Sequence, residues 1–211
     1  MGSSSGVHFS YDEIAKVVET GATVLDLGCG DGELLQLLRD TRQARVRGVE
    51  IQESMIRACL SKGISVFQGN LDEGLKEYGD GSYDYVILNE TLQVVHDPVQ
   101  LLTEMVRVGR RAVVNFPNFG NLVNRLQLLL GGQMPVNRDL PFEWFDTPNI
   151  HFCTRRDFVH LCQRMGIEVI SIIDIRHRRR ISGIAANLLA TECCFVLEGR
   201  SGATPANPGV V

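Results

Sequence analysis

Three glycines alternate with other residues in the stretch VLDLGCGDGELLQLL, which runs from Val24 to Leu38. They are Gly28, Gly30 and Gly32. Glycine lets a backbone approach a ligand closely and adopt positive φ angles without steric cost. In an open α/β sheet, the loop after the first strand lies where ligands bind. The spacing therefore predicts a small-molecule site at Gly28, Cys29 and Gly30, with Asp26 just before it.

The residues between and after these glycines indicate which ligand fits. The dinucleotide fingerprint is GxGxxG, whereas this loop reads GxGxG and places Glu33 where the third glycine of that fingerprint belongs. Asp31 and Glu33 suit the start of a helix, but they repel a pyrophosphate. S-adenosylmethionine carries a sulfonium and an ammonium and no phosphate. The loop therefore favours S-adenosylmethionine, or its product S-adenosylhomocysteine, over NAD.

Polar residues follow the next predicted strands and complete a candidate cofactor site. Glu50 comes about 24 residues after Asp26, near the spacing of a carboxylate that accepts ribose hydroxyls. Alternatives are that Glu50 is a solvated strand end and that Asp72 only caps a short helix. The remaining candidates for cofactor contact are Ile51, Asn70, Leu71, Asp72 and Asn89.

Candidates for a catalytic base lie after the fourth predicted strand. His96 has a side chain whose ordinary pKa suits proton transfer near neutral pH, and Glu90 is the second candidate. The alternative for His96 is a surface residue before a helix cap, because Asp97-Pro98 reads as a helix start. No motif for a methyl acceptor is readable, and no Cys/His spacing indicates a metal site.

The elements that must position these residues alternate between strand and helix patterns. Apolar or period-two runs predict five strands, and helical runs with short connections separate them. This alternation predicts a parallel α/β sheet covered on both faces. The predicted strands are 22–27, 46–50, 64–68, 83–88 and 111–115, with helices at 32–39, 53–61 and 98–106 and a short helix or turn at 71–78.

The pattern changes after the fifth strand. Residues 116–150 contain Gly, Asn, Pro and aromatics with one helical stretch at 122–130, and an N-cap at Thr154 starts a helix that Gly166 closes. Runs at 167–175 and 191–197 then predict a final antiparallel hairpin joined by the basic run Arg176–Arg180. The whole is the layout of the Rossmann-like class I methyltransferase fold, with a mostly parallel seven-stranded sheet.

Composition limits the class of protein. The chain has 211 residues, 44% hydrophobic and 22% charged, with a net charge of −4, which gives no electrostatic case for nucleic acid or membranes. Six unpaired-looking cysteines and the lack of a long apolar run favour a reduced, cytoplasmic protein. We expect a tag remnant at 1–6, one domain at 7–200 and a disordered tail at 201–211.

Several longer blocks of the chain carry a further signal. They are GVEI (48–51), YDYVILNETLQ (83–93), RVGRRAVVNFPNFGN (107–121) and MPVNRDLPFEWFDTPNIHFCTRRDF (134–158). These blocks resemble the family of the methionine biosynthesis protein MetW, which is class I methyltransferase-like. The resemblance implies a role in methionine biosynthesis together with the homoserine O-acyltransferase MetX. The alternative is an active methyltransferase with an unknown small-molecule acceptor.

The segment Phe116–Phe158 is rich in aromatic residues. We expect it to form a lid and part of a partner surface.

Overall fold

The structure is a computed structural model that describes residues 7–137, 140–183 and 185–199. The expected tag remnant at 1–6 and tail at 201–211 lie outside the described residues. One sheet runs through the domain in the order β3-β2-β1-β4-β5-β8-β6-β7. Its strands are β1 (Thr23–Leu27), β2 (Arg45–Glu50), β3 (Ser65–Gln68), β4 (Tyr83–Asn89), β5 (Gly109–Pro117), β6 (Ile167–Arg176), β7 (Arg179–Ile181) and β8 (Glu192–Gly199).

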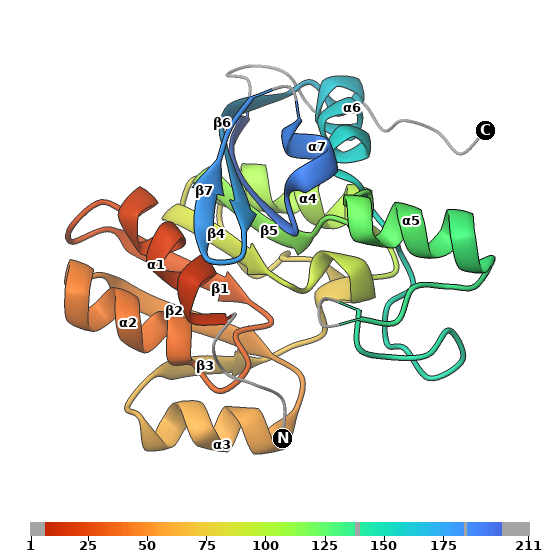
Figure 1. Cartoon of the computed structure of the whole chain (residues 1–211). Helices are drawn as coiled ribbons and strands as arrows, with labels where there is room; N and C mark the ends of the chain where they lie inside the picture. Colours follow the sequence, from red (N-terminus) through yellow and green to blue (C-terminus); the bar gives the residue numbers. More distant parts are fainter. Residues whose placement is uncertain (1–6, 138–139, 184, 200–211) are drawn as a thin grey trace.

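Helices cover both faces of this sheet (Figure 1). One apolar cluster joins the sheet to α1, α2 and α3, and a second cluster joins the other face to α4 and α6. The helices are α1 (Val7–Val17), α2 (Glu33–Arg42), α3 (Glu53–Ser61), α4 (Pro98–Val108), α5 (Leu122–Gly131), α6 (Arg155–Met165) and α7 (Ala186–Leu189), with short 3-10 turns η1 (Leu71–Glu73) and η2 (Leu92–Val94).

The first five strands are parallel, and they run on both sides of β1. Strands β2 and β3 lie on one side, and β4 and β5 on the other, so the strand order reverses at β1. A crevice forms beyond the carboxyl ends of strands at such a reversal. The fold therefore places the ends of β1, β2 and β4 around one potential ligand site. Within the described residues, no helix is both long and apolar enough to cross a membrane.

The predicted fold class is confirmed, with one correction to its strands. The sheet has eight strands rather than seven, because Arg179–Ile181 forms a short edge strand inside the basic region. The basic run therefore turns from β6 into β7 and does not join the two long antiparallel strands β6 and β8 directly. Its turn residues His177 and Arg178 both have positive φ angles, which match the twist of a two-residue hairpin turn.

The sequence signals for the ends of α6 and the start of α4 are also confirmed. Thr154 caps α6 in a capping box with Asp157, and Gly166 ends that helix in the left-handed conformation. Asp97 caps α4 through the backbone N–H of Gln100. Asp97 therefore starts a helix, as predicted.

Candidate functional site

The glycine loop is fastened to the neighbouring strand β2. The backbone N–H groups of Gly28 and Cys29 both donate to the Val49 carbonyl, at 2.8 and 3.1 Å. A Cβ on Gly28, whose φ is +72°, would lie 2.8 Å from Oγ1 of Thr91. At Gly30, whose φ is +55°, a Cβ would meet no atom of the described residues within 4 Å. The loop is thus packed against Thr91 at Gly28, whereas the position that a Cβ on Gly30 would occupy is free of contact with described residues. A ligand can therefore approach the backbone at Gly30 closely.

Glu50 ties this loop to the end of β2. Its Oε2 accepts the Gly30 N–H at 2.9 Å, and its Oε1 accepts the N–H groups of Ile51 and Gln52 at 2.8 Å each. The residue is only 7% exposed. A carboxylate has about four lone-pair positions, so these three bonds leave one position for a ligand hydroxyl. Glu50 is therefore a fixed, charged acceptor and not a solvated strand end.

A pocket of about 340 Å³ opens beside Glu50. It brings together six of the predicted cofactor residues: Gly28, Glu50, Ile51, Asn70, Leu71 and Asp72. Sequence reasoning missed Gln52, Thr91, Val94 and Val95, which also line it. Gln52 follows Glu50 and Ile51 directly in the chain. Thr91, Val94 and Val95 line the pocket because η2 and its flanks lie beside Gly28, and no residue spacing in the sequence signals that contact. We call this space the adenosine-side pocket, after the ligand that the sequence predicts for it.

Asp26 lies at the other side of the glycine loop. It is 2% exposed, and its Oδ1 has no hydrogen-bond partner among the described residues. Burial, followed by the nearby negative charge of Glu50, raises the pKa of Asp26 to about 7. A buried carboxyl with a free oxygen is suited to a cationic ligand group, which would favour its ionised form.

The raised pKa predicts how stability changes with pH. Between pH 3.8 and about 7 the folded protein holds a proton on Asp26 that the unfolded chain has released. The free energy of unfolding therefore falls as pH rises through this window, by on the order of 1.4 kcal/mol per pH unit. Asn cannot ionise, so Asp26→Asn should gain in melting temperature over the wild type between pH 5 and pH 8.

Thermal unfolding of both proteins at pH 5, 6.5 and 8 measures this difference. Asp12→Asn, an exposed change on α1, is the matched control and should keep a constant offset from the wild type. If Asp26→Asn also keeps a constant offset, Asp26 does not titrate in this range.

Tyr11 of α1 lies near Asp26 and three other carboxylates, those of Asp31, Glu33 and Glu90. We call the part of the crevice that these residues form the acidic half. Burial raises the pKa of the Tyr11 hydroxyl, and the negative charges of Asp26, Glu90, Glu33 and Asp31 raise it further. Four carboxylates therefore act on one phenol. Sequence reasoning missed Tyr11, although apolar residues at helical spacing on both sides of it signal a helix.

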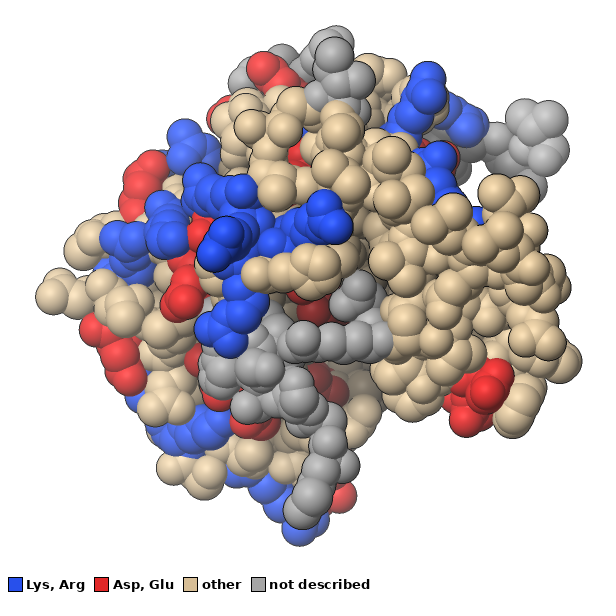
Figure 2. Space-filling view, in the orientation of Figure 1, with Lys and Arg blue, Asp and Glu red and all other residues tan. Residues whose placement is uncertain are grey.

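The basic hairpin holds α1 in this position. Arg180 of β7 forms an ion pair with Glu13, which is 1% exposed, and the Lys16 ammonium donates to the same carboxylate at 2.7 Å. Figure 2 shows Lys and Arg side chains gathered over this part of the surface. At least one arginine of the basic run thus has a structural contact, next to the helix that carries Tyr11.

The two predicted catalytic residues lie in different surroundings. The side chain of His96 is 79% exposed, and its Nδ1 lies 2.7 Å from Oδ2 of Asp72, while its backbone N–H donates to Oδ1 at 2.9 Å. Partial burial acts to raise the pKa of Asp72, but the hydrogen bonds from His96 prevail and lower it. Asn70 caps η1 instead, so Asp72 is not the cap. His96 therefore binds Asp72 of the η1 turn through both its ring and its backbone N–H.

Glu90 follows β4 directly, with an unusual backbone φ of +51°. Its backbone N–H donates to the Asn115 carbonyl at 2.9 Å, and its charge acts on Tyr11. Beside it, Asn89 accepts a hydrogen bond from the Asn115 amide at 2.9 Å. The Asn115 Oδ1 is buried and has no partner among the described residues. Glu90, unlike His96, therefore belongs to the acidic half of the crevice.

The Cys29 side chain faces the protein interior. It is 8% exposed. Its Sγ lies only 2.3 Å from the position that a Cβ on Gly48 would occupy, so glycine at position 48 makes room for it. Its Sγ is also 3.8 Å from that of Cys59. Burial raises the pKa of the Cys29 thiol well above its ordinary value. Only the Cys29 backbone is therefore available to a ligand.

The aromatic-rich segment Phe116–Phe158 divides into buried and exposed parts. Phe116 and Phe158 are in the core, 5.0 Å apart between ring centroids. Trp144 and Phe145 are 72% and 71% exposed. No described residue of this segment lines the adenosine-side pocket, so the expected lid over it is not formed in this structure.

Comparison with known proteins gives both a family and a fold. Residues 9–197 match the family described as methionine biosynthesis protein MetW. The bifunctional methionine biosynthesis protein MetXA/MetW of Rhodopirellula baltica is 38% identical over 176 residues, which are 78% of this chain and 28% of that relative. The chain thus corresponds to little more than a quarter of that protein.

Two solved structures agree in fold at low sequence identity. A SAM dependent methyltransferase from Archaeoglobus fulgidus has a TM-score of 0.69 at 18% identity, over 93% of this chain and 94% of that one. An S-adenosylmethionine dependent methyltransferase from Mesorhizobium loti has a TM-score of 0.66 at 13% identity, over 90% and 97%. These likenesses confirm the class I methyltransferase fold.

Proposed function

This chain belongs to the family of the methionine biosynthesis protein MetW, and from that premise we propose that it binds S-adenosylmethionine or S-adenosylhomocysteine in the described crevice. The observation that carries the proposal is Glu50, a buried carboxylate that three backbone N–H groups hold at the open side of the glycine loop. When bound, S-adenosylmethionine supplies a methyl group on a positively charged sulfur.

The residues present fit the parts of this cofactor. The remaining lone-pair position of Glu50 suits a ribose hydroxyl, and the pocket lined by Leu71 and Val95 suits the adenine ring. The open backbone at Gly30 leaves room for the amino-acid part. Asp26 has a free buried oxygen for an ammonium group, and Tyr11 stands beside it. This assignment uses the predicted residues Asp26, Gly28, Gly30, Glu50 and Asn70–Asp72.

The charge of the crevice argues for a cationic ligand. Asp26, Asp31, Glu33 and Glu90 all act on the Tyr11 hydroxyl, so their negative potentials overlap there. Such a field attracts a sulfonium and an ammonium and repels a pyrophosphate. NAD is therefore the natural ligand to compare with S-adenosylhomocysteine.

Isothermal titration calorimetry at pH 7.5 tests the cofactor proposal. S-adenosylhomocysteine should give a saturable heat with a 1:1 stoichiometry, and NAD should give none. Since salt screens the repulsion between the carboxylates and a pyrophosphate, both ligands should be titrated at low ionic strength. Absence of binding by either adenosyl ligand at millimolar concentration would remove the proposal.

We also propose that the protein acts with the homoserine O-acyltransferase MetX. Support comes from the Rhodopirellula relative, whose name joins MetXA to MetW in one chain. The described surface offers an apolar region suited to a partner: Leu129 and Leu130 of α5 are 79% and 81% exposed, close in the fold to Trp144. Figure 2 shows that the surface over α5 is mostly uncharged. Apolar patches of this kind mark protein–protein contacts.

A second candidate function is methyl transfer to a small molecule. The buried, unpartnered Oδ1 of Asn115 beside Glu90 favours it, because both residues stand at the carboxyl ends of strands where an acceptor would approach. Incubation with labelled S-adenosylmethionine and a bacterial metabolite extract tests this function. Transfer that is lost in Glu90→Gln, and kept in His96→Ala, would assign the base; label in no fraction would leave the accessory role.

A further inference from the structure

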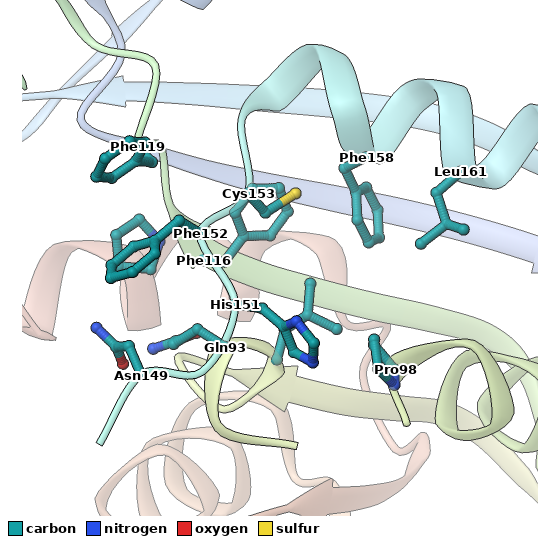
Figure 3. A pocket seen from close by; sticks show the side chains of 12 residues that line it. Gln93, Pro98, Phe116, Phe119, Asn149, His151, Phe152, Cys153, Phe158 and Leu161 are labelled. Atoms are coloured by element: carbon teal, nitrogen blue, oxygen red, sulfur yellow. The ribbon is translucent and has the colours of Figure 1, made fainter. Parts of the chain in front are cut away.

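A separate apolar pocket of about 160 Å³ lies between β5, α6 and residues 149–153 (Figure 3). Four aromatic rings contribute to its walls, from Phe116, Phe119, Phe152 and Phe158. The rings of Phe119 and Phe152 pack at 4.9 Å between centroids. An apolar cavity of about 150 Å³ is large enough to hold benzene. The size and the lining therefore suit a single aromatic ring or a short branched aliphatic group.

The polar lining of this pocket is small and uncharged. Gln93, Asn149 and His151 supply it, and no Lys, Arg, Asp or Glu is among the described lining residues. Figure 3 shows Gln93 and Asn149 at one end and Phe158 and Leu161 at the other. The backbone N–H of Asn149 donates to Oγ1 of Thr147 at 3.2 Å, but neither the Asn149 side-chain carboxamide nor the His151 ring has a hydrogen-bond partner in the described part of the chain. Both side chains are thus available to a polar group on a ligand.

The wall that carries these side chains is already in place. The backbone N–H groups of Ile150 and His151 donate to the Gln93 carbonyl at 2.9 and 3.1 Å, and the Phe119 N–H donates to the Cys153 carbonyl at 3.1 Å. A ligand therefore does not need to order residues 149–153 before it binds, which removes one cost of association.

The pocket is distinct from the cofactor crevice but shares a wall with it. Leu92 and Gln93 of η2 line the apolar pocket, whereas Thr91, Val94 and Val95, from the same turn and its flanks, line the adenosine-side pocket. We propose that the apolar pocket is a second ligand site, which binds a neutral small molecule with one aromatic or branched aliphatic group and one hydroxyl or amine held by Asn149 and His151. This site needs no assumption about the cofactor.

Titration of the full ¹⁵N-labelled chain with phenol, and with toluene as the analogue lacking a hydroxyl, tests the proposal by NMR. Both should bind saturably and shift the amide signals of Phe119, His151 and Phe152. Phenol should bind about fivefold more tightly, the effect of one added hydrogen bond. Leu161→Trp, which fills the pocket, should weaken both ligands by roughly tenfold or more. Leu129→Trp on exposed α5 is the matched control and should change neither.

The double variant Asn149→Leu with His151→Leu should abolish the preference for phenol and leave toluene binding intact. This result tests the site even if Leu161→Trp fails to fold. Shifts elsewhere on the protein, no saturable shift, or an unchanged affinity in Leu161→Trp would each overturn the proposal. S-adenosylhomocysteine titrated into the same samples separates the two sites. If phenol binds and the nucleoside does not, only the cofactor proposal is lost.

Discussion

Glu50→Gln is expected to weaken S-adenosylhomocysteine binding about a hundredfold, because hydrogen bonds to a charged group contribute roughly 1.5–3 kcal/mol each and 1.4 kcal/mol is a factor of ten. The carboxylate accepts N–H groups on both oxygens, from Gly30 on one and from Ile51 on the other. An amide has one acceptor oxygen, so its NH₂ group must face one of these donors. The variant therefore loses both a ligand acceptor and the fixed position of the loop.

Calorimetry on the wild type, Glu50→Gln and Glu53→Gln measures this effect. Glu53 stands three positions further along, at the start of α3, with a side chain 70% exposed and paired with Arg57. Its loss should leave affinity within about twofold, since exposed ion pairs contribute little. The melting temperature without ligand shows whether Glu50→Gln remains folded. A folded Glu50→Gln protein that binds with wild-type affinity would contradict the role given to Glu50.

Trp144→Ala is expected to weaken the complex with the homoserine O-acyltransferase about thirtyfold, the size of a central aromatic anchor at 2 kcal/mol. Trp144 lines a groove with Leu126 and Leu130 of α5, and its ring meets that of Phe145 edge to face at 5.7 Å. Such an exposed, pre-positioned aromatic side chain loses little freedom on binding. The indole should therefore supply much of the contact.

Interferometry with the immobilised acyltransferase from the same source gives the affinity, and the acylation rate gives the functional effect. Leu60→Ala is the matched control, because Leu60 is 59% exposed on α3, which packs on the opposite face of the sheet from α4 and α6. Equal affinities for Trp144→Ala and the wild type would exclude this groove as the contact. If the wild type neither binds the acyltransferase nor alters its rate, the partnership itself is excluded.

The grouping of the residues that we propose for cofactor binding could be predicted because parallel strands end at one edge of a sheet. Once the strand ending at Asp26 and the one ending at Glu50 are recognised, their neighbourhood follows from topology alone. The glycine spacing and the acids after it add the chemistry. The structure brings Asp72 to the same pocket, but its contact with His96 depends on how η1 and η2 fold over each other, which no local pattern encodes.

Three features could not be predicted from the sequence. Tyr11 comes close to Asp26 through the packing of α1, a helix that precedes the glycine loop in the chain, so no residue in or after the loop indicates it. The strand Arg179–Ile181 is short, charged and at the sheet edge, none of its residues is buried, and only Ile181 is β-branched. The apolar pocket likewise depends on residues 149–153 lying against Phe116. A segment without helical or strand periodicity does not show in its sequence which part of the core it will contact.

A crystal structure of the protein with S-adenosylhomocysteine tests the central claim most directly. We predict that a ribose hydroxyl lies within hydrogen-bond distance of the Glu50 Oε2, that the adenine contacts Leu71, and that the amino group lies on the Asp26 and Tyr11 side of the glycine loop. A ligand bound away from the Gly28–Gly30 loop, or with its ribose turned from Glu50, would contradict the account.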